Sequence, residues 1–259
     1  MRGNHVKINP QAFVDMKGSQ RIPMLTAYTF PVAASIESAG IPIILVGDTV
    51  GMVEMGFSTT RDVTIEHIEY HLGAVRRGAP NTHIIGDLPY LTDRSPEVAL
   101  INAKRLIQAG ADSIKLEGAK IDVIAHLVQN GIDVVGHTGL TPQTSKNFKK
   151  VGQSEQEAQT VLSEARAIEE AGAFMLVLEH IPDSLGQSIT NELIIPTIGI
   201  GAGTDCDGQV LVTNDALGLG SRWPPFSKQY MHASQAITTS AQKFAYEVTS
   251  GIFPKSADD

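Results

Sequence analysis

Six ionisable side chains in this sequence stand where short apolar runs end, and their types suit metal binding and proton transfer. Four are carboxylates and the others are a histidine and a lysine: Asp48, Asp87, Glu117, Glu179, His137 and Lys115. Carboxylates that meet at one place repel one another and raise one another's pKa unless a cation or a proton intervenes. Oxygen ligands beside a substrate site suit Mg²⁺, which takes one or two protein carboxylates and keeps waters. We therefore expect these side chains to converge around one divalent cation.

A repeated phrase in the chain predicts the elements that position these residues. An amphipathic run ending in Ala-Gly or a similar pair leads into a short apolar run, and a polar or acidic residue follows. Each phrase is typical of a helix, a C-cap glycine, a buried parallel strand and a loop. The strands predicted in this way cover residues 24–29, 43–49, 83–88, 113–117, 133–137, 174–179, 197–201 and 209–213. Eight strands alternating with helices favour an α/β fold of the closed (β/α)8 TIM-barrel type, whose active site lies at the carboxyl ends of the strands.

Helical patterns separate the predicted strands. They cover residues 65–77, 96–109 with Ser95 as N-cap, 121–129 and 155–171. Residues 1–20 predict an extra N-terminal helix that plugs the barrel bottom, and residues 227–250 predict the last helix. Because no interdomain linker or low-complexity tract interrupts the pattern, we expect a single barrel domain over residues 1–259.

Simpler interpretations exist for some of the six side chains. A lone acidic residue after a strand is commonly an N-cap or turn residue, but repetition at successive strands favours a shared site. For His137, a hydrogen-bonded turn histidine and a substrate contact both stay open. Lys115 lies two residues before Glu117 and faces the same way along the strand. A lysine near the barrel axis loses its hydration, so we expect an anionic substrate or a neighbouring carboxylate as its partner.

The composition limits the partners of the protein. The chain has 259 residues, 42% of them hydrophobic, and a net charge of -8, which argues against a nucleic-acid partner. Its local basic cluster, Lys146, Lys149 and Lys150, is expected on a solvated loop. No signal peptide or membrane-spanning run is present, and the single cysteine, Cys206, forms no intramolecular disulfide. These features predict a cytoplasmic protein without a membrane partner.

Familiar catalytic motifs of other classes are missing from the sequence. There is no zinc-binding spacing of Cys and His, no P-loop and no Gly-x-Ser-x-Gly elbow. The glycine-rich stretch at residues 199–203 fits either a phosphate-binding loop or a close-packed turn, and its spacing is not that of a dinucleotide site. Hydrolytic and nucleotide chemistries are therefore disfavoured.

The segments at the strand ends together resemble the ketopantoate hydroxymethyltransferase family. The resemblance extends from about residue 23 to residue 254, and the order of the motifs makes it specific. The matching segments are Thr-Ala-Tyr at 26–28, Val-Gly-Asp-Thr-Val-Gly-Met at 46–52, Val-Arg-Arg-Gly-Ala-Pro at 75–80, Asp-Leu-Pro at 87–89, Lys-Leu-Glu-Gly at 115–118, Gly-His-Thr-Gly-Leu-Thr-Pro-Gln at 136–143, Leu-Glu at 178–179, residues 198–203, and Asp-Gly-Gln-Val-Leu-Val at 207–212.

This resemblance implies a TIM barrel of the phosphoenolpyruvate/pyruvate type that binds Mg²⁺ and assembles as a homo-oligomer, commonly a decamer. The family's metal ligands fall on Asp48, Asp87 and Glu117, its substrate contacts fall on Asp48, Thr49, Asp87, Lys115 and His137, and its catalytic base falls on Glu179. The implied partners are a small 2-oxo acid and a folate.

The implied reaction belongs to pantothenate biosynthesis. A hydroxymethyl group passes from 5,10-methylenetetrahydrofolate to 3-methyl-2-oxobutanoate through a Mg²⁺-stabilised enolate and gives 2-dehydropantoate. The alternative is a Mg²⁺-dependent lyase or mutase with the same barrel, acting on another small oxo acid or a phosphonate; such lyases carry a loop cysteine, whereas Cys206 stands in a different context. A third possibility, a barrel that only binds a small acid, is disfavoured because binding does not require a base such as Glu179.

Three positions depart from the family pattern. Thr49 replaces the usual serine and keeps its hydroxyl. Residues 150–154 read Lys-Val-Gly-Gln-Ser in place of Lys-Val-Gln-Gly-Arg, and Asn214 stands where histidine is usual. The departures leave open how these loops contact the folate or a neighbouring subunit.

Overall fold

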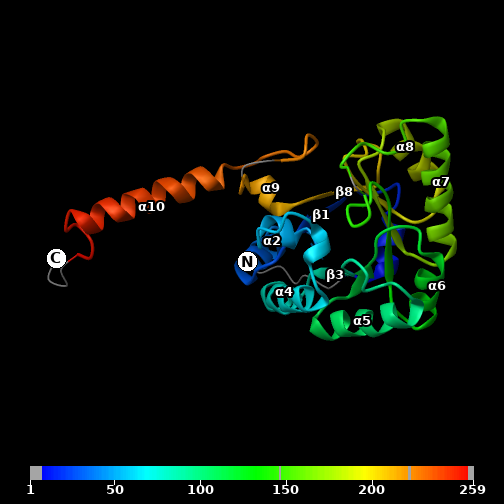
Figure 1. Ribbon diagram of the computed structural model, residues 1–259, viewed down its shortest axis with the longest axis horizontal. Helices are drawn as coiled ribbons and strands as arrows, with labels where there is room; N and C mark the ends of the chain where they lie inside the picture. The colour runs from blue at the N-terminus through cyan, green and yellow to red at the C-terminus, as the bar shows by residue number, and fades with distance from the viewer. Residues whose placement is uncertain (1–7, 146, 221–222, 256–259) are drawn as a thin grey trace. The chain divides into compact units, whose positions relative to one another are not determined.

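Eight short parallel strands form a closed barrel in the computed structural model, which describes residues 8–145, 147–220 and 223–255 (Figure 1). The strands follow one another around the barrel in chain order, and β8 pairs with β1. Their bounds are β1 Ile22–Thr26, β2 Ile43–Val46, β3 His83–Asp87, β4 Ser113–Lys115, β5 Val134–Gly139, β6 Met175–Glu179, β7 Thr197–Ile200 and β8 Gly208–Leu211. The predicted closed barrel is confirmed.

The observed strands end earlier than predicted at several places. Strand β1 stops at Thr26 instead of residue 29, because Thr29 is already the N-cap of the helix that begins at Phe30. Strand β2 stops at Val46, since the chain turns into a short helix at Val50. These early ends place polar residues on the loops just beyond the strands.

Helices between the strands cover the outside of the barrel, shorter helical segments lie in the loops, and two further helices follow the last strand in the chain (Figure 1). Their bounds are α1 Pro10–Asp15, α2 Phe30–Ser38, α3 Val50–Val53, η1 Thr60–Asp62, α4 Ile65–Gly78, α5 Pro96–Ala109, α6 Ile121–Gln129, α7 Glu155–Glu170, α8 Asp183–Glu192, α9 Thr213–Leu217 and α10 Ala233–Thr249. The predicted N-cap is confirmed, because the Ser95 hydroxyl accepts a hydrogen bond from the Val98 N–H. Within the described residues, no helix has the length and apolar character needed to cross a membrane.

The chain divides into two compact units, Met1–Leu211 and Val212–Asp259. The first unit contains all eight strands, and the second contains α9 and α10. Inside the second unit, the Tyr230 N–H donates to the Ala216 carbonyl and the Gly220 N–H donates to the Ser234 hydroxyl. The single domain over residues 1–259 stays a prediction.

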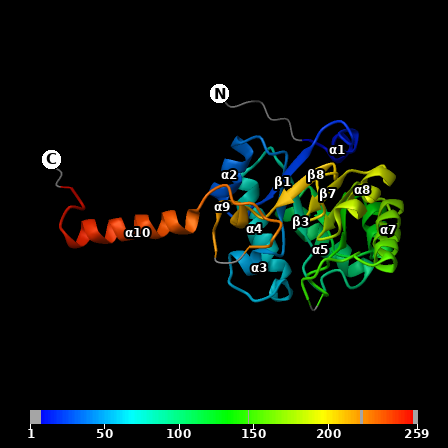
Figure 2. The same cartoon turned by 90° about the horizontal axis from the view of Figure 1, so that it is seen from above.

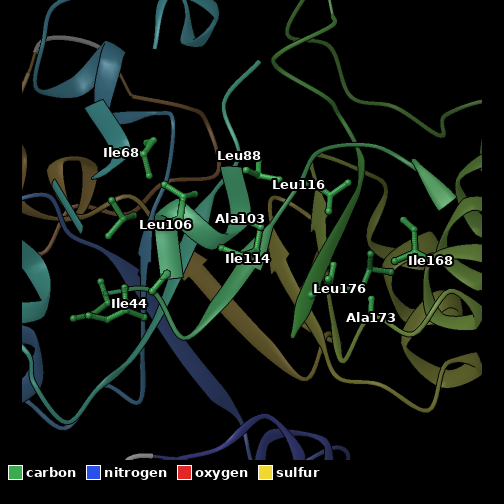
Figure 3. Close-up of a cluster of buried hydrophobic side chains, with 14 of the residues drawn as sticks. Ile44, Ile68, Leu88, Ala103, Leu106, Ile114, Leu116, Ile168, Ala173 and Leu176 are labelled. Atoms are coloured by element: carbon green, nitrogen blue, oxygen red, sulfur yellow. The ribbon is translucent and has the colours of Figure 1, made fainter. Parts of the chain in front are cut away.

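Two hydrophobic cores stabilise the barrel, because successive side chains of a strand point to opposite faces. Ile44 on β2 points outward and belongs to the core between strands and helices, where Leu106, Ile114 and Leu176 are also buried (Figure 3). Ile43, the preceding residue, belongs to the core inside the barrel. Because apolar side chains fill the barrel interior, the ionisable side chains of the candidate site lie at the ends of the strands.

Helix α1, labelled in Figure 2, covers residues 10–15 of the helix expected over residues 1–20 and packs against the core inside the barrel. Asn9 caps the helix with a hydrogen bond from the Ala12 N–H. Phe13 is fully buried in the interior core, and its ring contacts His83 at the start of β3 edge to face, with 5.3 Å between the centroids. Residues 1–7 of the predicted N-terminal helix lie outside the described residues.

Candidate active site

The carboxyl ends of β2 to β6 bring the ionisable residues to one end of the barrel. Asp87 ends β3 and lies opposite Lys115, the last residue of β4. Glu179 ends β6 and lies opposite Gly139, two residues after His137 on β5. Asp48 and Glu117 follow their strands by two residues. Because the strands are parallel neighbours, residues distant in sequence lie side by side at this end.

Lys115 pairs with a carboxylate, one of the two partners expected for it. Its ammonium lies 2.9 Å from each carboxylate oxygen of Asp87. Lys115 is 6% exposed and Asp87 is 2% exposed, so the ion pair is shielded from water. The backbone N–H of Asp48 also points at Asp87, with 3.4 Å to Oδ2.

His137 lies between two carboxylates and is itself buried. Its Nδ1 is 3.9 Å from Oε2 of Glu117, and its Nε2 is 3.3 Å from Oε2 of Glu179. Neither contact has the geometry of a hydrogen bond in this arrangement. Of the two interpretations of His137, a hydrogen-bonded turn residue does not fit, since the residue belongs to strand β5. Its ring instead connects the cluster around Glu117 with Glu179, whose side chain is 20% exposed.

The electrostatics show that negative charge is in excess here. Burial raises the pKa of Glu117 to about 8, and the charges of Asp48 and Asp87 add to the effect against the opposing charge of Lys115. Burial and Asp87 likewise raise the pKa of Asp48. Burial alone would lower the pKa of Lys115, but Asp87 and Asp48 hold it above its ordinary value. One lysine therefore does not compensate the carboxylates, and a further cation would be stabilised among them.

The donor set fits a hard divalent cation. Asp48, Asp87 and Glu117 supply only oxygen atoms and are each at most 6% exposed. Among the described residues, no group of three or more His, Cys, Asp or Glu side chains is arranged so that it could hold a metal ion by itself. Mg²⁺ does not need such a group, because it typically binds one or two protein carboxylates together with water and substrate.

Sequence reasoning did not single out Gln143, although the residue belongs to this cluster. Gln143 lies in the loop after β5, is 1% exposed and hydrogen-bonds both Asp48 and Glu117. Gln143 is the last residue of the family segment at residues 136–143, and the resemblance of that segment is the signal in the sequence that could have identified it. By contrast, Thr49 is the N-cap residue of α3 beside Asp48, and within the described ranges its hydroxyl forms no hydrogen bond with the cluster.

Tyr28 is a further residue beside this cluster, and its only signal in the sequence is the family segment Thr-Ala-Tyr at residues 26–28. It follows β1 and is 2% exposed. Burial raises the pKa of its hydroxyl, the Thr26 side chain opposes the rise, and the charges of Asp48 and Asp87 add to it. Tyr28 is therefore a neutral phenol beside the acidic cluster.

Gly139 fixes the relation between β5 and Glu179. Its φ is +100°, and a Cβ atom built on it would lie 2.3 Å from the backbone oxygen of Glu179. We expect Gly139→Ala to cost about 2 to 5 kcal/mol of unfolding free energy, from left-handed strain and overpacking together. Urea unfolding measures this loss. Gly131→Ala is the control, because φ is +75° there but a Cβ atom would meet nothing within 4 Å, so the loss should stay near 1 to 2 kcal/mol.

The remaining features of the sequence have the following places in the structure. A Cβ atom on Gly203 would lie 2.8 Å from the Cβ of Asp183, so close packing accounts for a glycine in the stretch at residues 199–203. Of the basic cluster, Lys149 is exposed and Lys150 is partly buried, whereas Lys146 lies outside the described residues. Asn214 lies in α9 of the second unit.

Comparison with known proteins decides the family. The family model described as ketopantoate hydroxymethyltransferase matches residues 7–256. The chain belongs to the ketopantoate hydroxymethyltransferase family. A 3-methyl-2-oxobutanoate hydroxymethyltransferase from Synechocystis sp. is 44% identical over 96% of this chain and 98% of the relative. One from Acaryochloris marina is 47% identical over 90% of this chain and 93% of the relative. The predicted family and enzyme class, a hydroxymethyltransferase, are confirmed.

Solved structures confirm the barrel type. Phosphonopyruvate hydrolase in complex with oxalate and Mg²⁺ matches with a TM-score of 0.63 and 14% identity, over 94% of this chain and 88% of that chain. A 2,3-dimethylmalate lyase of the PEP mutase/isocitrate lyase superfamily matches with a TM-score of 0.60 and 14% identity, over 96% and 90%. At this identity the likeness concerns the fold, while membership of the ketopantoate hydroxymethyltransferase family favours the transferase over the lyase or mutase alternative.

Proposed function

We propose that this chain transfers a hydroxymethyl group from 5,10-methylenetetrahydrofolate to 3-methyl-2-oxobutanoate and so makes 2-dehydropantoate for pantothenate biosynthesis. The supporting observation is the buried cluster of Asp48, Asp87, Glu117 and Lys115, with Glu179 beside it at the same end of the barrel. Such a cluster combines sites for a cation and an anion with a base, as proton removal next to a carbonyl requires.

The buried carboxylates would hold Mg²⁺ and one end of the substrate. Asp48 and Asp87 are the proposed metal ligands, and Glu117 completes the surroundings directly or through water. When bound, Mg²⁺ supplies positive charge that stabilises the enolate form of the 2-oxo acid. Lys115 and the Thr49 hydroxyl are proposed to contact the substrate carboxylate, with His137 orienting the substrate from the opposite side.

Glu179 is the proposed base. It would take the proton from C3 of the 2-oxo acid, and the electrons of that C–H bond would pass into the enolate. C3 would then bond to the methylene carbon of the folate as one of the two carbon–nitrogen bonds of that carbon breaks. Water would next replace the second nitrogen, which takes one water proton, and the remaining OH would complete the hydroxymethyl group. The side chain of Glu179 is 20% exposed, which supports the proposal that it reaches a substrate at this end of the barrel.

Product formation tests the proposal directly. Protein, Mg²⁺, 3-methyl-2-oxobutanoate and 5,10-methylenetetrahydrofolate should give 2-dehydropantoate, detected by mass spectrometry. Without folate and in D2O, the C3 proton signal of the 2-oxo acid should disappear from the NMR spectrum, since enolisation needs no one-carbon donor. Cleavage of a phosphonate or dicarboxylic acid without hydroxymethyl transfer would instead support the lyase or mutase alternative.

A homo-oligomer, with a decamer as the specific expectation, and a cytoplasmic location belong to the same proposal. Helix α10 carries large exposed apolar side chains, including Ile237, Phe244 and Tyr246. Exposed apolar groups of this size are typical of surfaces covered by another chain. Light scattering on the purified protein measures the subunit number.

A further inference from the structure

Gln143 reaches two carboxylates that come from different strands. Its side-chain amide donates to Oδ2 of Asp48 at 2.8 Å and to the carbonyl oxygen of Leu88 at 3.1 Å. Its backbone N–H donates to Oε1 of Glu117 at 2.8 Å. All of these groups are buried. A single residue therefore contacts two of the three carboxylates proposed to surround the metal.

The chemistry of the neighbours fixes the orientation of the Gln143 amide. Asp48 Oδ2 and the Leu88 carbonyl are both acceptors, so the NH2 group must face them. The reverse orientation would place the amide oxygen against a carboxylate in a buried site, which is unfavourable. Gln143 thus has one arrangement at this position.

The loop that carries Gln143 is also held from its outer side. Arg61, in η1, donates from Nε to the Gln143 carbonyl at 2.7 Å and from Nη2 to the Ser145 carbonyl at 3.3 Å. The Arg61 guanidinium also lies over the ring of Tyr90, 5.6 Å from its centroid. The loop is therefore fixed on both faces, and this limits the positions that Gln143 can take.

The hydrogen bonds from Gln143 use one oxygen of each carboxylate, and the second oxygen of each remains available. Gln143 bonds Oδ2 of Asp48 and Oε1 of Glu117, so Oδ1 and Oε2 remain for a cation or its waters. As a neutral donor, an amide orients a carboxylate without repelling a metal ion, unlike Lys115, which bonds both oxygens of Asp87. Partners of metal ligands commonly act in this way.

We propose that Gln143 is a positioning residue that orients the carboxylates of Asp48 and Glu117 for Mg²⁺, and that Arg61 anchors the loop which presents it. This inference rests on the proposed function, because it assumes that the cluster binds Mg²⁺. The test substitutes Gln143→Met, which keeps the length of the side chain and the backbone N–H but removes the amide donors. Gln153→Met is the matched control, since Gln153 is exposed and its side-chain amide donates to the Lys150 carbonyl, away from the carboxylate cluster.

The measurement is Mg²⁺ affinity by titration calorimetry on the protein without substrates, with thermal unfolding recorded in parallel. We expect Gln143→Met to weaken Mg²⁺ binding about tenfold to hundredfold, and Gln153→Met to leave it unchanged. Arg61→Met, which loosens the loop without entering the cluster, should weaken it by a smaller factor and serves if Gln143→Met does not fold.

The outcomes separate this inference from the proposed function. If the unsubstituted protein binds Mg²⁺ and Gln143→Met binds it equally well, the positioning role is wrong while the proposed function stands. A lower melting temperature with unchanged Mg²⁺ affinity would likewise reduce Gln143 to a structural residue. If the unsubstituted protein binds no Mg²⁺, the metal site of the proposed function fails, and this inference fails with it.

Discussion

Glu179→Gln should lower the rate of C3 proton exchange in 3-methyl-2-oxobutanoate by about two to four orders of magnitude, the usual contribution of a general base. Glutamine keeps the size of the side chain at the end of β6 but has no lone-pair base that accepts a proton near neutral pH. Because Glu179 is not a proposed metal ligand, Mg²⁺ affinity should stay within a few-fold. NMR exchange rates in D2O and calorimetry measure the two properties separately.

The control for this variant is Glu170→Gln, the same change at the exposed end of α7. It should exchange the C3 proton at the unsubstituted rate. Full exchange activity in Glu179→Gln would remove Glu179 from the mechanism. Loss of both exchange and Mg²⁺ binding would instead place Glu179 among the groups that hold the cation.

The sequence predicted the barrel because each strand has a local signature. A glycine after a helix and a short run of branched apolar residues identify β2 or β6 without knowledge of any other element. The carboxyl ends of parallel strands then share one end of the barrel, so Asp87 and Glu179 could be assigned to one site. Helix α8 is harder to find, since Ser, Gly, Gln, Thr and Asn dominate it and Leu185 and Ile189 are its two large apolar residues.

Tertiary contacts determined what the sequence left open. The partner of Lys115 could be a substrate or a carboxylate until the β3–β4 register placed Asp87 opposite it. Gln143 comes from a loop without periodicity, and its bond to Asp48 joins residues 95 positions apart. Long-range contacts of this kind determine which loop side chains belong to the site, and neither hydrophobic periodicity nor composition predicts such contacts.

Lys115→Met should destabilise the metal-free protein strongly. The substitution leaves Asp87 buried beside Asp48 and Glu117 without the only ammonium that pairs with it among the described residues. Breaking a buried ion pair by removing one partner costs about 3 to 5 kcal/mol, since the remaining charge keeps its desolvation penalty. Chemical unfolding near pH 7 in EDTA measures this loss. Lys104→Met, at an exposed position of α5, should change the unfolding free energy by less than about 0.5 kcal/mol.

Two experiments show whether the loss of the Lys115 charge causes the expected loss of stability: the addition of Mg²⁺ and a second substitution at Asp87. Saturating Mg²⁺ should recover part of the stability of Lys115→Met, about 2.7 kcal/mol at a concentration one hundred times the dissociation constant, because the cation binds only the folded cluster. The double variant Lys115→Met with Asp87→Asn should also recover stability, since it removes both charges, yet it should bind Mg²⁺ poorly. If Lys115→Met is as stable as the unsubstituted protein without Mg²⁺, the lysine does not balance the carboxylates. The acidic cluster would then be stable through protonation alone, and a cation would not be needed to explain it.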